Sequence, residues 1–313
     1  MSMAAHWWTL APKLQRVLQS STPPPSQPWG LELDNAGPSG ERVHLTGRFH
    51  PSDGARTALV TIHGLGGCTE SEYMVRMAKL ASEAGFACLR LNLRGSDRQG
   101  DDFYHAGLTS DLHAALKSPL LAGFDTLALV GFSMGGHVAL KAATENLDPR
   151  VTAVAAVCSP LDLAPCAVSF DRPNRWLYRR YVMASLLDIY RAVAERRPVP
   201  LPVEEAAKLT RIRDWDEKIV APRWGFEGPD DYYARASVGP LLPSLKVPAL
   251  LVQAAADPMV PDAAVRPALD AASGVTAHWV ARAGHVGFPR DVDLGMDAPL
   301  GLEPQLLRWI QDA

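Results

Sequence analysis

The 313-residue sequence has little of what marks secreted, zinc-binding or membrane-spanning chains. Its four cysteines (Cys68, Cys88, Cys158 and Cys166) show no Cys-x-x-Cys spacing and no clustered histidines, which argues against a zinc site or a disulfide framework. The N-terminus lacks the charged-then-apolar layout of a signal peptide, and no Asn-x-Ser/Thr sequon occurs. No apolar run reaches the length of a membrane span. We therefore expect a cytoplasmic protein without a transmembrane segment.

The patterns that bind nucleic acids, nucleotides and metals are also missing. The net charge is −3, so no basic surface for a nucleic-acid partner is indicated. There is no P-loop, and Gly64-x-Gly66 is too short for a dinucleotide fingerprint. Ligand clusters for a metal are absent. We expect no cofactor and no metal.

Short apolar runs alternate with amphipathic stretches along most of the chain. This alternation predicts an α/β protein with a mostly parallel central sheet and helices on both faces. After an opening hairpin, with strands over 29–33 and 42–49, the expected strands are 58–62, 87–91, 127–130, 151–157, 249–253 and 276–280. The expected helices are 70–84, 109–116, 138–143, 264–272 and 303–311.

The alternation stops between residues 160 and 242. Two helical stretches are predicted there, 175–197 and 203–219, and this block is interpreted as a helical lid inserted into a core of residues 29–159 and 243–313. Residues 1–28 are predicted to form a helix followed by a Pro/Ser linker. That helix could lie on a membrane surface, but one short segment carries little apolar area, so docking on its own domain is the preferred interpretation.

The stretch around Ser133 organises the chain. Gly131-Phe132-Ser133-Met134-Gly135 is a G-x-S-x-G pattern between a buried strand and a run of good helix formers. Such a context forces a sharp turn that exposes the serine hydroxyl at the sheet edge, close to the free N–H groups of a helix start. Ser133 is therefore the predicted nucleophile.

A serine nucleophile needs a base, and the base needs an orienting carboxylate. Asp257 follows the strand 249–253 almost at once, and His285 follows the next strand. Both therefore fall in loops beyond strand carboxyl ends, in the order Ser, Asp, His. Asp262 is a rival for the acid, ranked second because it lies farther from the strand.

Two backbone N–H groups should stabilise the oxyanion of a tetrahedral intermediate. Met134 directly follows the nucleophile and supplies one. Leu65, in the glycine-rich loop after the strand 58–62, supplies the other. His63, at the start of this loop, is expected to hold the loop in place rather than to take part in chemistry.

With these residues assigned, the chain resembles the α/β-hydrolase superfamily and, within it, the AB-hydrolase-4 or YheT-like esterases. The resemblance runs from about residue 58 to residue 288. Its carriers are His63-Gly64-Leu65-Gly66-Gly67, Arg90-Leu91-Asn92-Leu93-Arg94-Gly95, Phe103-Tyr104-His105-Ala106-Gly107, Gly131 to Gly136, Asp231-Tyr232-Tyr233 and Gly284-His285-Val286-Gly287-Phe288. The resemblance implies a triad of Ser133, Asp257 and His285, and activity as a carboxylesterase, an acylglycerol lipase or an acyltransferase. His137 departs from the asparagine expected after the double glycine.

The sequence thus predicts a serine hydrolase that cleaves small carboxylic esters of short to medium acyl chains through an acyl-enzyme. The alternatives are an acyltransferase that passes the acyl group to an alcohol and a non-catalytic binding module on a hydrolase fold. One apolar stripe of the lid (Tyr178, Val182, Leu186, Ile189, Val193) is expected to pack on the domain. Trp176, Leu187 and Trp215 then remain to line the substrate pocket.

Overall fold

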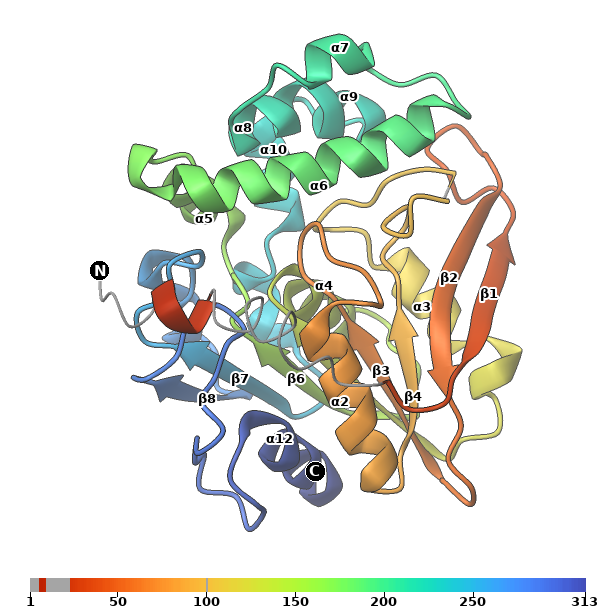
Figure 1. Cartoon of the computed structure of the whole chain (residues 1–313), viewed down its shortest axis with the longest axis vertical. Coiled ribbons are helices and arrows are strands. Elements are labelled where there is room, and N and C mark those ends of the chain that lie inside the picture. The colour runs from red at the N-terminus through yellow and green to blue at the C-terminus, as the bar shows by residue number, and fades with distance from the viewer. Residues whose placement is uncertain (1–5, 10–22, 100) are drawn as a thin grey trace.

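The structure is a computed structural model that describes residues 6–9, 23–99 and 101–313. Within these residues the chain forms one eight-stranded sheet in the order β1-β2-β4-β3-β5-β6-β7-β8 (Figure 1). The strands are β1 (Gln27–Leu33), β2 (Val43–His50), β3 (Thr57–Ile62), β4 (Ala87–Leu91), β5 (Thr126–Phe132), β6 (Val151–Val157), β7 (Ala249–Ala254) and β8 (Val275–Val280). The hairpin β1–β2 pairs antiparallel, and β2 joins β4 antiparallel, whereas all the other pairs are parallel. The predicted α/β fold is confirmed.

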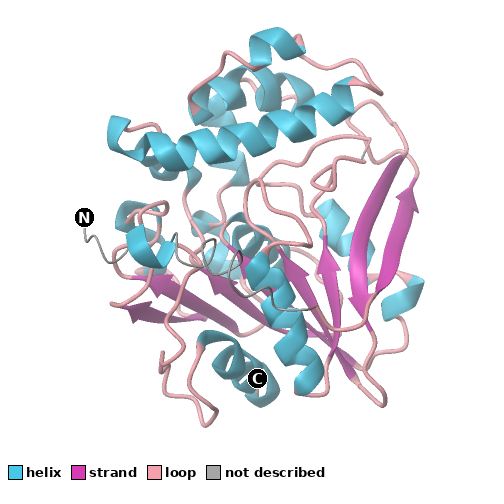
Figure 2. Ribbon diagram, viewed as in Figure 1, coloured by secondary structure: helices cyan, strands magenta, loops and turns pink. Residues whose placement is uncertain are grey.

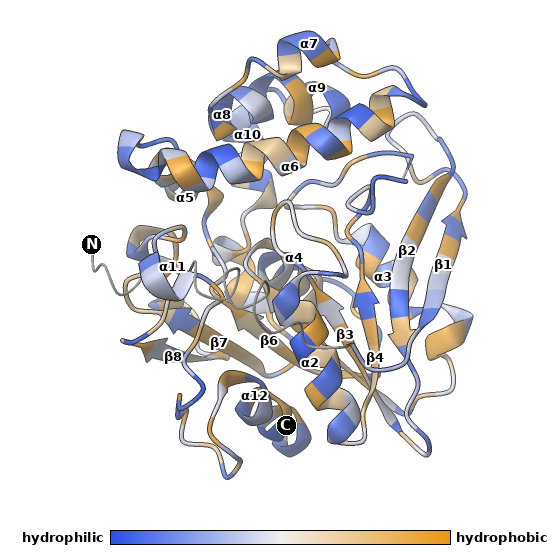
Figure 3. Cartoon of the chain, in the orientation of Figure 1, coloured by the Kyte–Doolittle hydropathy of each residue, from blue (hydrophilic) through white to orange (hydrophobic). Residues whose placement is uncertain are grey.

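Helices cover both faces of the sheet (Figure 2). On one face, α2 (Glu72–Glu83) and α12 (Leu302–Asp312) pack in a core with alternate side chains of β5, β6 and β7. On the other face lie α3 (Ser110–Leu116) and α4 (Met134–Ala143). The inner parallel strands β3, β5 and β7 are buried on both sides, which explains their apolar runs (Figure 3), whereas the edge strand β8 is partly exposed.

The segment between β6 and β7 is helical and lies across the end of the sheet where the parallel strands finish (Figure 1). Its α-helices are α5 (Leu163–Phe170), α6 (Trp176–Ala194), α7 (Val203–Ala206), α8 (Ile212–Trp215), α9 (Ala221–Trp224) and α10 (Pro229–Ala236). A π-helix, η3 (Asp216–Val220), joins α8 to α9, and the 3-10 turns are η2 (Pro173–Arg175) and η4 (Gly239–Ser244). We call residues 160–242 the helical segment.

The predicted bounds of two helices were wrong. The helix expected over 203–219 is broken after Ala206 and restarts at Ile212, because the carboxylate of Asp171, distant in sequence, accepts the backbone N–H groups of Ile212 and Arg213. The helix expected over 264–272 consists of a 3-10 turn, η5 (Asp262–Ala264), and the single turn α11 (Arg266–Leu269).

The sequence reading also missed α5, whose first turn contains a proline. Asp162 caps this helix by accepting the N–H of Ala164 at 3.1 Å, and Pro165 falls in the first turn, where no intrahelical donor is needed.

The N-terminal prediction is only partly covered by the structure. Residues 6–9 form a helical turn, whereas the rest of the expected helix (Leu10, Leu14, Val17, Leu18) and the first part of the linker lie outside the described residues. The linker ends before residue 28, because β1 begins at Gln27. Among the described residues, no helix is long and apolar enough to cross a membrane.

Candidate active site

Ser133 lies in the turn between β5 and α4 and has a backbone conformation that side chains rarely adopt. Its φ is 53° and its ψ is −120°. A Cβ atom on Gly135 would lie 2.2 Å from the carbonyl oxygen of Ile62, and one on Gly131 would lie 2.3 Å from the backbone of Gly135. Only glycine allows helix and strand to approach this closely, so these two residues allow the strained turn that presents Ser133.

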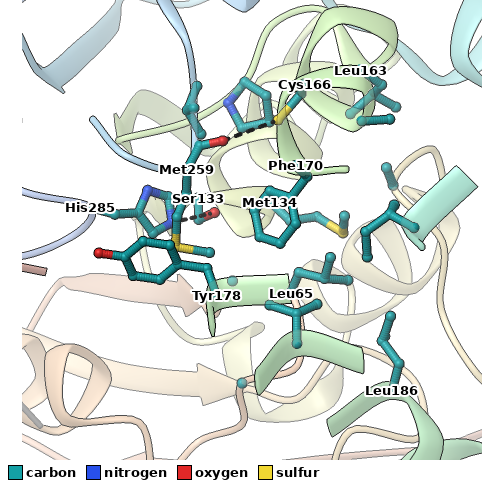
Figure 4. Close-up of a pocket in the computed structure, with 18 of the residues that line it drawn as sticks. Leu65, Ser133, Met134, Leu163, Cys166, Phe170, Tyr178, Leu186, Met259 and His285 are labelled. Carbon is teal, nitrogen blue, oxygen red and sulfur yellow. Dashed lines mark hydrogen bonds between the residues drawn. The ribbon is translucent and has the colours of Figure 1, made fainter. Parts of the chain in front are cut away.

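The side chains of Ser133, His285 and Asp257 form one hydrogen-bonded chain. His285 Nε2 is 2.9 Å from Ser133 Oγ (Figure 4). On the other side of the ring, Nδ1 is 2.9 Å from Asp257 Oδ2. Asp257 and His285 are both buried, with 7% and 6% of their surface exposed. In this geometry the carboxylate fixes the tautomer in which Nδ1 carries the proton and Nε2 faces the serine hydroxyl.

The loop after β7 holds Asp257 in place. Its Oδ1 accepts the backbone N–H groups of Met259 at 2.7 Å and Val260 at 2.9 Å. Asp262, the rival candidate, pairs with Arg266 at 3.1 Å, and its side chain is 54% exposed. The structure therefore brings Asp257, and not Asp262, to His285.

Thr9, to which the sequence analysis assigned no role, contacts the loop that carries His285. The backbone N–H of His285 donates to Thr9 Oγ1 at 2.8 Å, from 276 residues away in sequence. Nearby, His6 Nδ1 lies 2.6 Å from the Tyr178 hydroxyl of α6. The helical turn at 6–9 therefore connects the histidine loop to the helical segment. No local pattern could have revealed this contact, because it is purely tertiary.

The glycine-rich loop after β3 runs against the nucleophile. A Cβ on Gly64 would lie 3.0 Å from the Cβ of Ser133. Two tyrosines fix the loop: Tyr73 accepts the N–H of Gly64 at 3.0 Å, and Tyr104 accepts that of Gly66 at 2.7 Å. Leu65 lies between these two anchored residues, and both Leu65 and Met134 line the cavity above Ser133.

His63 is buried beneath the loop and contacts only protein groups. Its Nδ1 is 2.8 Å from the carbonyl oxygen of Gly64, and its Nε2 accepts the N–H of Leu93 at 3.0 Å. Burial lowers the pKa of this histidine to about 4, so the ring is neutral. These contacts agree with the loop-holding role expected for it.

The cavity above Ser133 has a volume of about 270 Å³ and mostly apolar walls. The helical segment supplies most of the apolar side chains in these walls, among them Leu163, Ala167 and Phe170 of α5; Tyr178, Tyr181, Val182 and Leu186 of α6; and Ile212, Trp215 and Val220. Figure 4 shows Phe170 and Tyr178 beside the serine and histidine, and Leu186 farther away, beyond Leu65.

Of the three predicted pocket residues, Trp215 lines the cavity, whereas Trp176 and Leu187 do not. Trp176 is 56% exposed, and Leu187 packs partly buried against the core. The rotation of α6 differs from the prediction, because part of the stripe expected to pack on the domain, including Leu186, lines the cavity. Periodicity identifies the apolar face of a helix but not what lies opposite it.

Two acidic residues line this cavity; Glu72 pairs with Arg76, whereas Asp216 is buried without an ion pair among the described residues. Asp216, the first residue of η3, lines the wall and is only 8% exposed. Its Oδ2 accepts the Tyr233 hydroxyl at 2.6 Å. Burial raises the pKa of Asp216 to about 7, and the nearby charge of Asp171 acts in the same direction.

His137, the departure from the family pattern, connects α4 to both ends of the helical segment. It is fully buried, with Nδ1 2.9 Å from the carbonyl oxygen of Pro160 and Nε2 2.9 Å from that of Ala236. The helix that starts at the nucleophile is thereby tied to the residues where the helical segment leaves and rejoins the core.

Among the described residues, one group of three potential metal ligands occurs, formed by Cys158, Asp257 and His285. Two of them already bind each other, and burial raises the pKa of the Cys158 thiol well above its ordinary value. A metal ion would need the deprotonated thiolate of Cys158. The three side chains therefore favour the hydrogen bond between Asp257 and His285 over a bound metal ion.

The model of the alpha/beta hydrolase family matches residues 59–294, a range that includes the serine, the aspartate, the histidine and the helical segment. The chain belongs to this family. The resemblance to YheT-like esterases is also confirmed: the protein named "Putative esterase YheT" of Escherichia coli (strain K12) is 28% identical over 90% of this chain and 84% of its own length.

A second relative is larger than this chain. Phospholipase ABHD3 of Mus musculus is 27% identical over 77% of this chain, and the match covers 60% of the phospholipase. Among solved structures, the alpha/beta hydrolase GrgF from Penicillium sp. sh18 superposes with a TM-score of 0.53 at 21% identity, over 83% of this chain and 91% of that one. This structural similarity supports the fold.

Proposed function

We propose that the protein is a serine hydrolase that cleaves carboxylic esters of short to medium acyl chains through an acyl-enzyme on Ser133. The observation that carries the proposal is the hydrogen-bonded chain from Ser133 through His285 to Asp257 at the base of an apolar cavity. The names of two relatives, an esterase and a phospholipase, support ester hydrolysis.

In the first half-reaction, Ser133 Oγ attacks the ester carbonyl carbon while His285 Nε2 takes the hydroxyl proton. Asp257 keeps the ring oriented and stabilises the imidazolium that forms. The backbone N–H groups of Leu65 and Met134 donate to the oxyanion of the tetrahedral intermediate. Collapse of this intermediate breaks the bond to the alkoxy oxygen, which leaves as the alcohol after receiving the proton from His285.

In the second half-reaction, a water molecule gives a proton to His285 and attacks the acyl carbon. The second tetrahedral intermediate expels Ser133 Oγ, which recovers the proton from His285. The acid is released and the free enzyme is restored. Both half-reactions use the same oxyanion donors, because the reacting carbon occupies the same position in each.

The cavity walls favour an acyl chain over a charged or peptide group. Each methylene that leaves water for such a wall contributes about 0.8 kcal/mol. We propose that residues 160–242 form a lid over the core of residues 29–159 and 243–313. Helices α5 and α6 carry much of the wall, so the lid would set the length of acyl chain that fits.

The deciding experiment compares Ser133→Ala with Ser244→Ala, a change at an exposed serine in η4. We expect Ser133→Ala to lower kcat on chromogenic esters by a factor on the order of 10⁴–10⁶ and to abolish labelling by a fluorophosphonate probe. Ser244→Ala should change neither. Undiminished turnover in Ser133→Ala, or labelling at another serine, would refute the assignment.

Adding alcohols to the same assay separates hydrolysis from acyl transfer. A hydrolase releases the free acid as its main product. If new esters dominate even at low alcohol concentration, the protein is an acyltransferase that shares the same first half-reaction.

A chain-length series tests the acyl pocket. We expect kcat/KM to rise from acetyl to medium-chain esters and then to level off. Leu186→Ala should flatten that rise, whereas Trp176→Ala, outside the cavity, should not. The acyl pocket would be contradicted if acetyl esters were the best substrates, or if Leu186→Ala lost kcat/KM equally at every chain length.

A further inference from the structure

Large apolar side chains on the surface are concentrated in one part of the molecule. Among the described residues, six large hydrophobic side chains are exposed. Five of them belong to the helical turn at 6–9, to α5 or to the first two turns of α6: Trp7, Val168, Trp176, Leu177 and Tyr181, each 48–59% exposed. The sixth, Leu300, lies in the loop before α12. We call the group of five the apolar rim.

The apolar rim lies next to the cavity. Tyr181 is both 54% exposed and part of the cavity wall. Val168 follows the wall residue Ala167 on α5. Trp7 lies in the same helical turn as Thr9, another wall residue. Figure 1 shows this turn on the same side of the molecule as α5 and the start of α6.

The charges of residues 168–181 are almost all positive. The stretch carries four arginines, of which Arg172 and Arg180 are exposed and Arg179 is half-buried. Its one acidic residue, Asp171, has a side chain only 5% exposed, and its carboxylate is occupied by the N–H groups of Ile212 and Arg213. Within residues 168–181, which carry four of the five rim residues, the exposed charges are therefore cationic.

We propose that the apolar rim and its arginines dock the protein on an anionic lipid surface, with the cavity mouth facing the lipid. Tryptophan and tyrosine rings are favoured at the interface between lipid and water, and arginines there pair with phosphate groups. A lipid surface fits this face better than a protein partner does, since the rim continues into a cavity with apolar walls. An ester substrate could then enter the cavity from the lipid without crossing water; that consequence rests on the proposed function, whereas the docking does not.

The test uses the full chain with Ser133→Ala, so that binding is measured without hydrolysis. Co-sedimentation with phosphatidylcholine vesicles, with and without phosphatidylserine, gives the bound fraction. We expect binding to the vesicles that contain phosphatidylserine and weaker binding to the others. Replacing Trp176 and Leu177 together by serine should weaken binding by at least about tenfold, because apolar burial of each side chain contributes roughly that factor.

Leu300→Ser is the matched control, since it removes a similarly exposed leucine from the loop before α12, outside the rim, and should leave binding unchanged. Arg172→Gln with Arg180→Gln should weaken binding mainly at low salt and only when phosphatidylserine is present. Acetyl ester hydrolysis by the rim variants in the chain that retains Ser133 reports correct folding.

Three results would overturn the docking proposal. They are no binding to either vesicle, an equal loss in Leu300→Ser, and a dimer in solution that the rim variants dissociate, which would make the rim an interface between copies. Failure of the proposed function is a separate outcome: vesicle binding would remain while ester turnover and probe labelling would be absent.

Discussion

Replacing Asp216 by asparagine should stabilise the protein increasingly as the pH rises. The carboxyl group lies in the cavity wall without an ion pair among the described residues, and burial raises its pKa from 3.8 to about 7. Asparagine keeps an oxygen that can accept the Tyr233 hydroxyl, so the variant removes the titration while retaining the hydrogen bond.

The sign and the size of the effect follow from proton linkage. In the unfolded chain the carboxyl loses its proton near pH 3.8, whereas in the folded protein it keeps the proton until about pH 7. The stability that this group gives the fold is complete below pH 3.8 and is lost as the pH rises to 7. At about 1.4 kcal/mol for each tenfold change in proton affinity, the full loss is roughly 4 kcal/mol, of which about 2–3 kcal/mol falls between pH 5 and pH 8.

The assay is urea unfolding of the wild type and of Asp216→Asn at several pH values from 5 to 8. The difference in free energy of unfolding should grow by about 2–3 kcal/mol in favour of the variant over this range. Asp230→Asn is the control, because Asp230 is fully exposed and its pKa is lowered by Arg213, so its titration lies below the range. A difference between wild type and Asp216→Asn that stays constant from pH 5 to pH 8 would show that Asp216 ionises normally and would refute the reasoning.

Three further predictions concern the proposed catalytic machinery. In ester assays, Asp257→Asn should lower kcat by several orders of magnitude and Asp262→Asn by less than about twofold, since only the carboxylate of Asp257 contacts the histidine. A larger loss in Asp262→Asn than in Asp257→Asn would mean that the wrong acid was chosen. Gly135→Ala should destabilise the protein by about 3 kcal/mol or more in thermal unfolding, because its Cβ would lie 2.2 Å from a backbone oxygen, whereas Gly123→Ala, with no atom within 4 Å, should change stability little. EDTA should leave ester turnover unchanged, and activity lost in EDTA but restored by a metal ion would contradict a metal-free mechanism.

The sequence alone determined which segments form the strands of the sheet and which strand ends carry Ser133, Asp257 and His285. Buried parallel strands appear as short apolar runs, and the glycines around Ser133 mark a turn where backbone segments touch. Because the carboxyl ends of parallel strands meet at one edge, the loops that carry Asp257 and His285 could be assigned to the same place as Ser133. The structure adds the contacts among the three side chains, each 2.9 Å long.

The tertiary structure decided what pattern reading could not. The rotation of α6 depends on its neighbours, so Leu186 faces the cavity while Trp176 faces solvent. The break in the helix expected over 203–219 depends on Asp171, 41 residues before Ile212. The contact of Thr9 with His285 and the buried carboxyl of Asp216 arise only when distant segments meet. Local sequence encodes which residues form a strand, a turn or an apolar face, whereas the partner of each face is fixed by the packing of the whole chain.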